Sequence, residues 1–147
     1  MARGAKPAGY SGTPLPKKLG LKDGQRALFI ALPDELENLT RAAGFASVSR
    51  APSWGRARGR GYDLIHAFTL SQSEIARYLP ALRQALAEDG MIWVSWPKRA
   101  SKIPTDVTED TIRSAALEGD LVDVKVAAID EKWSGLKLMV RVASRRK

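Results

Sequence analysis

The residues with the clearest chemical potential lie in segment 96–102 (WPKRASK), which starts at the end of a short apolar run. Trp96 offers a flat ring for stacking, and Lys98, Arg99 and Lys102 offer positive charge. Such groups can together hold a nucleotide, a nucleic-acid base with its phosphate, or an acidic loop of a partner protein. The alternative role is structural: Trp96 packs the loop onto the domain, and the cations are solvated.

Positive charge recurs along the chain of 147 residues, which has 24 Lys and Arg against 16 Asp and Glu and a net charge of +8. A basic surface raises the affinity for nucleic acids and for other anionic surfaces, although the same charges can simply be solvated. Outside segment 96–102 the basic groups are Lys17, Lys18 and Lys22; Arg50, Arg56, Arg58 and Arg60; and Arg145, Arg146 and Lys147.

The composition excludes several kinds of chemistry. The chain has no Cys and one His, so disulfides, thiolate ligands and multi-His metal sites are ruled out. His66 lies in an apolar run and is expected to be a core residue rather than a general base, because no nucleophile stands in a suitable context. No P-loop motif is present. We therefore expect no catalytic residue, no metal ligand and no resident cofactor.

Apolar runs and turn signals in the first part of the chain predict short strands and a helix. Residues 26–32 are nearly all apolar, which is typical of a strand buried on both faces. Pro33 and the acidic residues after it begin a helix that Gly44 ends, and a short second strand covers 45–49. Residues 50–61 lack periodicity and are expected to form a mobile Arg/Gly loop.

The alternation of strands and helices continues after this loop. Residues 62–70 predict a strand. Ser71 and Glu74 form a capping-box pattern at the start of a helix that ends at Asp89-Gly90. Pro80 is expected to kink or split that helix.

A strand, a helix and a hairpin complete the predicted elements. Residues 91–96 form the strand, and Asp106 with Glu109 is expected to cap a helix that runs to about Glu118.

Alternating apolar residues over 122–126 and 136–142 flank turn residues at 130–135, so these runs predict an antiparallel hairpin. A centred turn would place Asp123 opposite Arg141.

This order predicts right-handed crossovers and a mostly parallel sheet. The expected fold is a small three-layer Rossmann-like α/β domain with a C-terminal antiparallel hairpin, and its element order resembles a reduced class I methyltransferase. Residues 1–25 are expected to form an irregular basic arm, 26–143 a single domain and 144–147 a basic tail. Open α/β sheets bind ligands beyond the carboxyl ends of their strands. The candidate binding surface therefore comprises Lys17, Lys18, Thr69, Ser71, Trp96, Lys98, Arg99 and Lys102.

Several motifs follow one further pattern: Gly9-Tyr-Ser-Gly-Thr-Pro-Leu15, Lys17-Lys-Leu-Gly20, Trp93-Val-Ser-Trp-Pro-Lys98, Val122-Asp-Val-Lys-Val126 and Trp133-Ser-Gly-Leu136. This pattern resembles an uncharacterised bacterial family of small domains of unknown function. The resemblance covers about residues 9–142 and implies a small cytoplasmic α/β domain with no assigned activity. It supplies no functional residues, and the Arg/Gly segment 55–61 is particular to this chain.

The methyltransferase-like order makes S-adenosylmethionine a hypothesis to test on the residues. That cofactor needs a Gly-rich turn after the first strand and usually an acid at the end of the second. Here the turn is Leu32-Pro33-Asp34-Glu35, and the second strand is expected to end at Ser49-Arg50. Acids at each predicted helix start also satisfy the positive dipole ends internally. Methyl transfer is therefore disfavoured.

These patterns favour a non-catalytic binding or regulatory module whose partner is an acidic protein or a nucleic acid. The alternative is an enzyme or a small-ligand binder that takes a nucleotide-like compound in the strand-end crevice around Thr69, Ser71, Trp96 and Lys98. The arm residues 11–15 could instead fill that crevice. No apolar run is long enough to span a membrane and no secretory signal is visible, so a cytoplasmic location without membrane contact is expected. The oligomeric state stays open.

Overall fold

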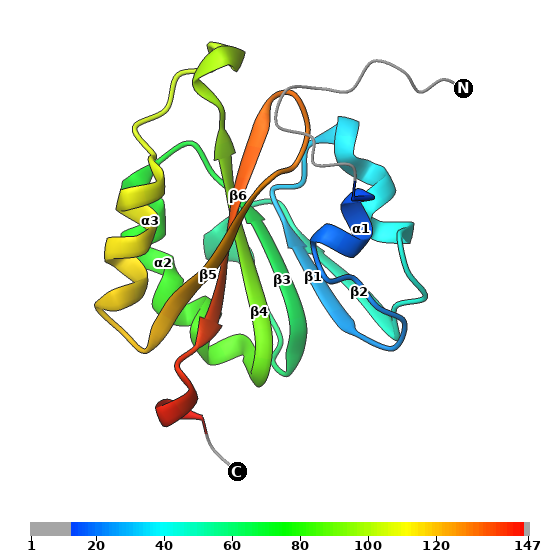
Figure 1. The fold of residues 1–147 in the computed structure, drawn as a ribbon. Helices are drawn as coiled ribbons and strands as arrows, with labels where there is room; N and C mark the ends of the chain where they lie inside the picture. Colours follow the sequence, from blue (N-terminus) through cyan, green and yellow to red (C-terminus); the bar gives the residue numbers. More distant parts are fainter. Residues whose placement is uncertain (1–12, 146–147) are drawn as a thin grey trace.

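The computed structural model describes residues 13–145, which form one six-stranded sheet in the order β2-β1-β3-β4-β6-β5 (Figure 1). The strands are β1 (Arg26–Ile30), β2 (Ser47–Ala51), β3 (Tyr62–Phe68), β4 (Leu86–Pro97), β5 (Leu121–Ala128) and β6 (Trp133–Val140). Strands β2, β1, β3 and β4 pair in parallel, and β6 runs antiparallel to both β4 and β5. This topology confirms the predicted mostly parallel sheet with a C-terminal antiparallel hairpin.

Helices cover both faces of the sheet (Figure 1). The α-helices are α1 (Leu15–Lys18), α2 (Gln72–Ala85) and α3 (Glu109–Leu117), and the 3-10 helices are η1 (Asp34–Arg41), η2 (Trp54–Arg56), η3 (Arg99–Ser101) and η4 (Val142–Ser144). Helices α2 and α3 pack on one face through a core that includes Leu79, Leu82 and Ile112. The segment around α1 and η1 packs on the other face, where Leu19 and Leu36 are buried. The result is the expected three-layer arrangement.

The N-terminal arm is more ordered than the sequence predicts within its described part. Residues 15–18 form α1, and Leu19 behind them is fully buried. The indole Nε1 of Trp93 donates a hydrogen bond to the Leu19 carbonyl at 3.0 Å. This contact fixes the segment after α1 on the sheet, whereas residues 1–12 of the predicted arm lie outside the described residues.

The predicted Arg/Gly loop 50–61 begins later than expected and contains a packed residue. Residues 50 and 51 belong to β2, which is shifted by two residues from the predicted strand 45–49. Trp54 is buried, and its Nε1 donates to the Phe68 carbonyl at 2.9 Å. Loop composition alone did not reveal that one indole ties this segment to the end of β3.

The segment after β1 forms η1, a 3-10 helix, where the sequence predicts a helix beginning at Pro33. Leu36 has non-helical backbone angles, so a regular α-helix is interrupted there. The strand itself ends at Ile30, because Ala31 takes a positive φ of 57° that strand geometry does not allow.

The helix α2 ends four residues before the predicted Asp89-Gly90 stop, and β4 begins at once with Leu86. Leu86 is extended and pairs with Tyr62, after which the pairing register between β3 and β4 becomes irregular. A Cβ on Gly90 would lie 2.9 Å from the Tyr62 carbonyl oxygen, so this close approach of two strands requires glycine. Pro80 lies inside α2 without splitting it, contrary to one of the predicted alternatives.

The hairpin register differs from the centred turn predicted by the sequence. Asp123 lies opposite Leu138 rather than Arg141, and an irregularity between Asp123 and Lys125 then places Lys125 opposite Lys137. The turn before β6 is held by Asp130 Oδ1, which accepts the N–H groups of residues 132 and 133 at 2.8 Å. A shifted turn and a bulged strand therefore decide the pairing.

The cap of α3 is also different from the predicted Asp106–Glu109 pair. Thr108 is the N-cap, and its hydroxyl accepts the Thr111 N–H at 3.2 Å. The Thr111 hydroxyl oxygen accepts the Thr108 N–H at 2.9 Å in return. The Thr108–Thr111 pair therefore forms the capping box of this helix start without Asp106.

Candidate anion-binding surface

A hollow of about 410 Å³ lies beyond the carboxyl end of β4. Trp96, Lys98, Arg99 and Lys102 all line it, so the structure brings together four of the residues singled out from the sequence. Its second wall is the segment 103–109, whose contribution the sequence pattern did not indicate.

Backbone contacts hold the basic loop in place and leave its cations available. The Lys98 N–H donates to the Lys132 carbonyl at 2.7 Å, which links the loop to the hairpin turn. The Ser101 hydroxyl donates to the Lys98 carbonyl at 2.7 Å. Lys102 ends η3 in the left-handed region, with φ 61°, and the side chains of Arg99 and Lys102 are exposed. Trp96 is half-buried and packs against the core on the α2 side, so part of its ring serves the fold.

Thr69 and Ser71 contribute to helix capping rather than to this hollow. The Thr69 hydroxyl donates to Glu74 Oε1 at 2.6 Å and accepts the Ser71 N–H at 3.1 Å. The Ser71 hydroxyl accepts the Glu74 N–H at 3.4 Å, which is half of the predicted capping box. Glu74 binds Thr69 instead of reaching back to Ser71. Neither hydroxyl group lines the hollow beyond β4.

The helix starts carry the acids that the sequence indicated. Asp34, Glu35 and Glu37 lie in the first turn of η1, and Glu109 with Asp110 lies in that of α3. Arg113 pairs with both acids of α3. These carboxylates occupy the positive ends of the helices, where an external anion would otherwise bind.

The residues at the ends of β1 and β2 do not fit S-adenosylmethionine. A hollow of about 480 Å³ lies there, lined by Phe29, Ala31, Leu32, Arg50, Ala51 and Pro52. The turn after β1 contains Leu32 and Pro33 where the cofactor needs glycines for close backbone approach. β2 ends at Ala51, two residues beyond the predicted strand 45–49, and offers no acid for ribose hydroxyls. Arg50 is already engaged, since it donates to Glu37 at 2.7 Å and thereby lowers the pKa of that carboxyl.

His66 is a core residue, as the sequence predicts. Its ring is fully buried and stacks on Phe68 with centroids 4.3 Å apart. Nε2 lies 2.7 Å from the Ser95 hydroxyl, which is also fully buried. Within residues 13–145, Nδ1 has no hydrogen-bond partner. Burial lowers the pKa of His66 to about 3, so the ring is neutral and inaccessible to a substrate.

Lys17 and Lys18 lie on α1. Lys17 is exposed and does not line the hollow beyond β4. Lys18 is nearer: burial lowers its pKa first, and the charges of Lys125 and Lys98 lower it further. Lys125 was missed as a surface residue because its position depends on the irregular hairpin register. The available signal was that each strand of the predicted hairpin carries one lysine, Lys125 and Lys137.

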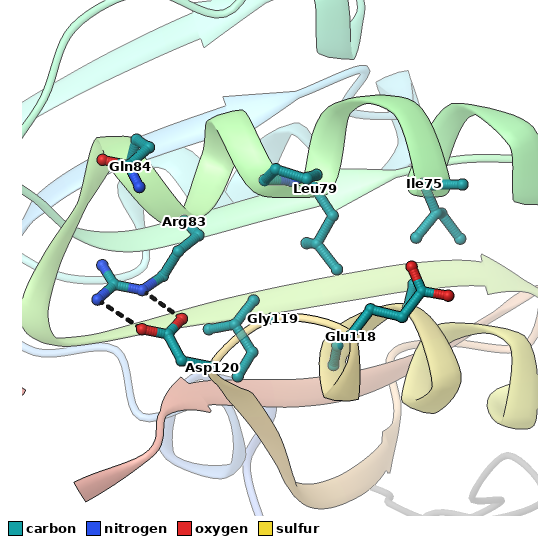
Figure 2. Close-up of a pocket in the computed structure, with 12 residues that line it drawn as sticks. Ile75, Leu79, Arg83, Gln84, Glu118, Gly119 and Asp120 are labelled. Atoms are coloured by element: carbon teal, nitrogen blue, oxygen red, sulfur yellow. Dashed lines mark hydrogen bonds and ion pairs between the residues drawn. The ribbon is translucent and has the colours of Figure 1, made fainter. Parts of the chain in front are cut away.

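A second hollow of about 560 Å³ lies between α2 and α3 (Figure 2). Arg83 closes one end, where its guanidinium donates to both carboxylate oxygens of Asp120 at 2.8 and 3.1 Å. None of the candidate residues lines this hollow.

Comparison with solved structures defines the class of fold. The chain is similar to the N-methyltransferase NodS from Bradyrhizobium japonicum WM9, with a TM-score of 0.62, 13% identity, and coverage of 86% of this chain and 92% of that one. It is also similar to a TehB-like SAM-dependent methyltransferase from Corynebacterium glutamicum, with a TM-score of 0.61, 11% identity, and coverage of 86% and 85%. These similarities show a class I methyltransferase-like Rossmann fold, as the element order predicted.

Part of the chain also matches a sequence family. Residues 70–142 match the family described as "Protein of unknown function (DUF3052)". The match confirms the predicted resemblance to a family of unknown function over this range, and the motifs at 9–20 lie outside it. The chain has no match among curated proteins. Across residues 13–145, no helix is long and apolar enough to cross a membrane, and no group of three or more His, Asp or Glu is placed to hold a metal ion.

Proposed function

We propose that this protein is a non-catalytic binding module that recognises a polyanionic partner through its basic loop 98–102 and the lysines beside it. The supporting observation is the shared hollow of Lys98, Arg99 and Lys102. None of these three takes part in an ion pair of residues 13–145. Glu109 also lines the hollow, but it forms an ion pair with Arg113. The three cations of the loop therefore attract an anionic partner.

The chemistry of the remaining polar residues favours binding over catalysis. His66 is neutral and buried, and the hydroxyls of Thr69 and Ser71 are engaged at the start of α2. The acids at the helix starts repel an anion from the sites where such folds usually hold one. The basic loop therefore remains as the favoured contact surface.

The test measures binding of a fluorescent 20-base-pair DNA duplex and of a fluorescent polyglutamate peptide at about 50 mM salt, where electrostatic binding is strong. The triple variant Lys98→Ala/Arg99→Ala/Lys102→Ala should weaken binding of the preferred polyanion at least about tenfold. The matched control Arg56→Ala/Arg58→Ala/Arg60→Ala removes the same charge from the Arg/Gly loop and should change affinity less than about threefold. If the wild type binds neither polyanion, or both triples lose affinity equally, the proposal is wrong.

A second candidate is a binder of small nucleotide-like ligands, because the hollow beyond β4 has the size of a small-molecule site and includes a Trp ring. A thermal-shift screen with nucleotides and S-adenosyl compounds distinguishes the two. We expect no stabilisation by these compounds. A nucleotide that raises Tm in the wild type but not in Trp96→Ala would establish the second candidate instead.

A further inference from the structure

Five lysines from four segments lie in a row along β6. Lys125 on β5 is directly opposite Lys137 on β6, and opposite residues of an antiparallel pair share one face. Lys125 Nζ donates to the Lys18 carbonyl at 3.1 Å, so its ammonium group lies at the end of α1. Lys137 Nζ lies 4.0 Å from the position a Cβ would take on Gly20, just beyond α1.

A hollow locates one end of the row, and a backbone hydrogen bond locates the other. Lys22 and Lys137 line one hollow of about 310 Å³ together with Met139, near the end of β6. At the opposite end, the Lys98 N–H donates to the Lys132 carbonyl, next to the start of β6. The row thus follows β6 from Trp133 toward Met139, a distance of about 20 Å at the usual rise per strand residue.

Charge coupling supports this arrangement. Burial lowers the pKa of Lys18, and the charges of Lys125 and then Lys98 add to the effect. Burial also lowers the pKa of Lys137, followed by the charges of Lys125 and Lys22. Each lysine is therefore within electrostatic reach of the next one.

Two carboxylates lie at one end of the row. Asp63 and Asp89 line the hollow at the Lys22 end, where their negative charge offsets part of the row. Within residues 13–145, no ion pair involves Lys22, Lys98, Lys125 or Lys137. Like charges without ion-pair partners repel one another, so a partner with opposite charges lowers their free energy.

We propose that this lysine row, which consists of Lys98, Lys18, Lys125, Lys137 and Lys22, binds the phosphate backbone of a nucleic-acid duplex. The inference rests on the proposed function and specifies its partner. The row extends along β6, and each lysine supplies a point charge to a phosphate without reading a base. Binding along it is therefore independent of sequence.

The residue types favour a duplex over other polyanions. The cores of protein interfaces are depleted in Lys and enriched in Tyr, Trp and Arg, whereas the row contains only Lys. Proteins that bind single strands stack bases on exposed aromatic rings. Within residues 13–145, none of the exposed large apolar side chains is aromatic. A duplex, which presents phosphates without free bases, matches the row best.

The test uses a row variant, Lys22→Gln/Lys125→Gln/Lys137→Gln, whose substitutions avoid the loop 98–102. The control is Arg56→Gln/Arg58→Gln/Arg60→Gln, which changes the net charge equally. Affinity for a 20-base-pair duplex is measured between about 50 and 200 mM salt, where each phosphate contact contributes about −0.9 to the slope of log K against log salt. Five contacts predict a slope of about −4.5 for the wild type, and the row variant should be shallower by about 2.7. The control should keep the wild-type slope.

Three results would overturn the inference, and they separate it from the proposed function. If the row variant binds like the wild type while the loop triple is weakened, the row is not the contact and the proposed function stands. If neither variant is weakened, both proposals are wrong. If a single strand or polyglutamate of equal charge binds more tightly than the duplex, the partner class is wrong.

Discussion

Asp106 Oδ1 accepts a hydrogen bond from the backbone N–H of Gln72 at 2.8 Å, so a residue that precedes α3 caps the start of α2. The Thr105 hydroxyl donates to the Leu70 carbonyl at 2.7 Å beside it. These two bonds fasten the wall of the hollow beyond β4 to the junction between β3 and α2. The loop opposite this wall carries Lys98, Arg99 and Lys102, so the hollow has one firmly anchored side.

Replacing Asp106 should therefore destabilise α2 rather than α3. Asp106→Ala removes an acceptor for a free N–H group at the helix start and should lower the free energy of unfolding by about 1 kcal/mol. Asp106→Asn keeps an oxygen acceptor, so its free energy of unfolding should fall by less. Urea unfolding of the two variants measures the difference. An Asp106→Ala variant as stable as the wild type would show that this cap contributes nothing.

The buried His66 should make stability fall in mild acid. Burial lowers its pKa from 6.5 to about 3 in the folded protein, so only the unfolded chain gains a proton as the pH falls through this window. Falling pH thus favours unfolding, and between pH 7.5 and pH 5 the loss from this group should be about 2 kcal/mol.

The variant His66→Gln isolates this effect, because the carboxylates titrate alike in both proteins. The difference in unfolding free energy between wild type and variant should shrink by about 2 kcal/mol over the same pH range. A difference that stays constant with pH would mean that His66 does not remain neutral in the folded protein.

Glycine is required at position 135 by the packing between β4 and β6. A Cβ there would lie 2.9 Å from the Ser95 hydroxyl, 3.0 Å from Ile129 Cδ1 and 3.1 Å from Trp93 Cε3. Gly135→Ala should therefore lower stability by about 1–3 kcal/mol through overpacking. Gly119→Ala is the matched control, since the nearest atom to its Cβ would be 3.9 Å away. Equal unfolding midpoints for the two variants would contradict this packing.

Much of the sheet could be predicted because its strands leave local signals. The apolar runs at 62–70 and 91–96 and the alternation over 122–126 each correspond to an observed strand. The end of α2 could not be predicted, because it depends on the pairing of Leu86 with Tyr62 across the sheet. The cap from Asp106 to Gln72 is also a long-range contact, although the sequence suggested a local one.

The sequence also predicted part of the candidate surface. The segment 96–102 is a local cluster of Trp and cations, and its members line one hollow. Thr69 and Ser71 were singled out by their position after a strand, but the capping of α2 uses their hydroxyls. The adjacency of Lys125 and Lys137 depends on one irregular position in β5 and so cannot be read from alternation.

Backbone amide shifts of the labelled protein, recorded by NMR during titration with a 20-base-pair duplex, test the central claim most directly. The account predicts that the changes concentrate at residues 98–102 and along β5 and β6 near Lys125 and Lys137, and that they disappear at high salt. Changes centred on the ends of β1 and β2, or on the hollow between α2 and α3, would contradict it.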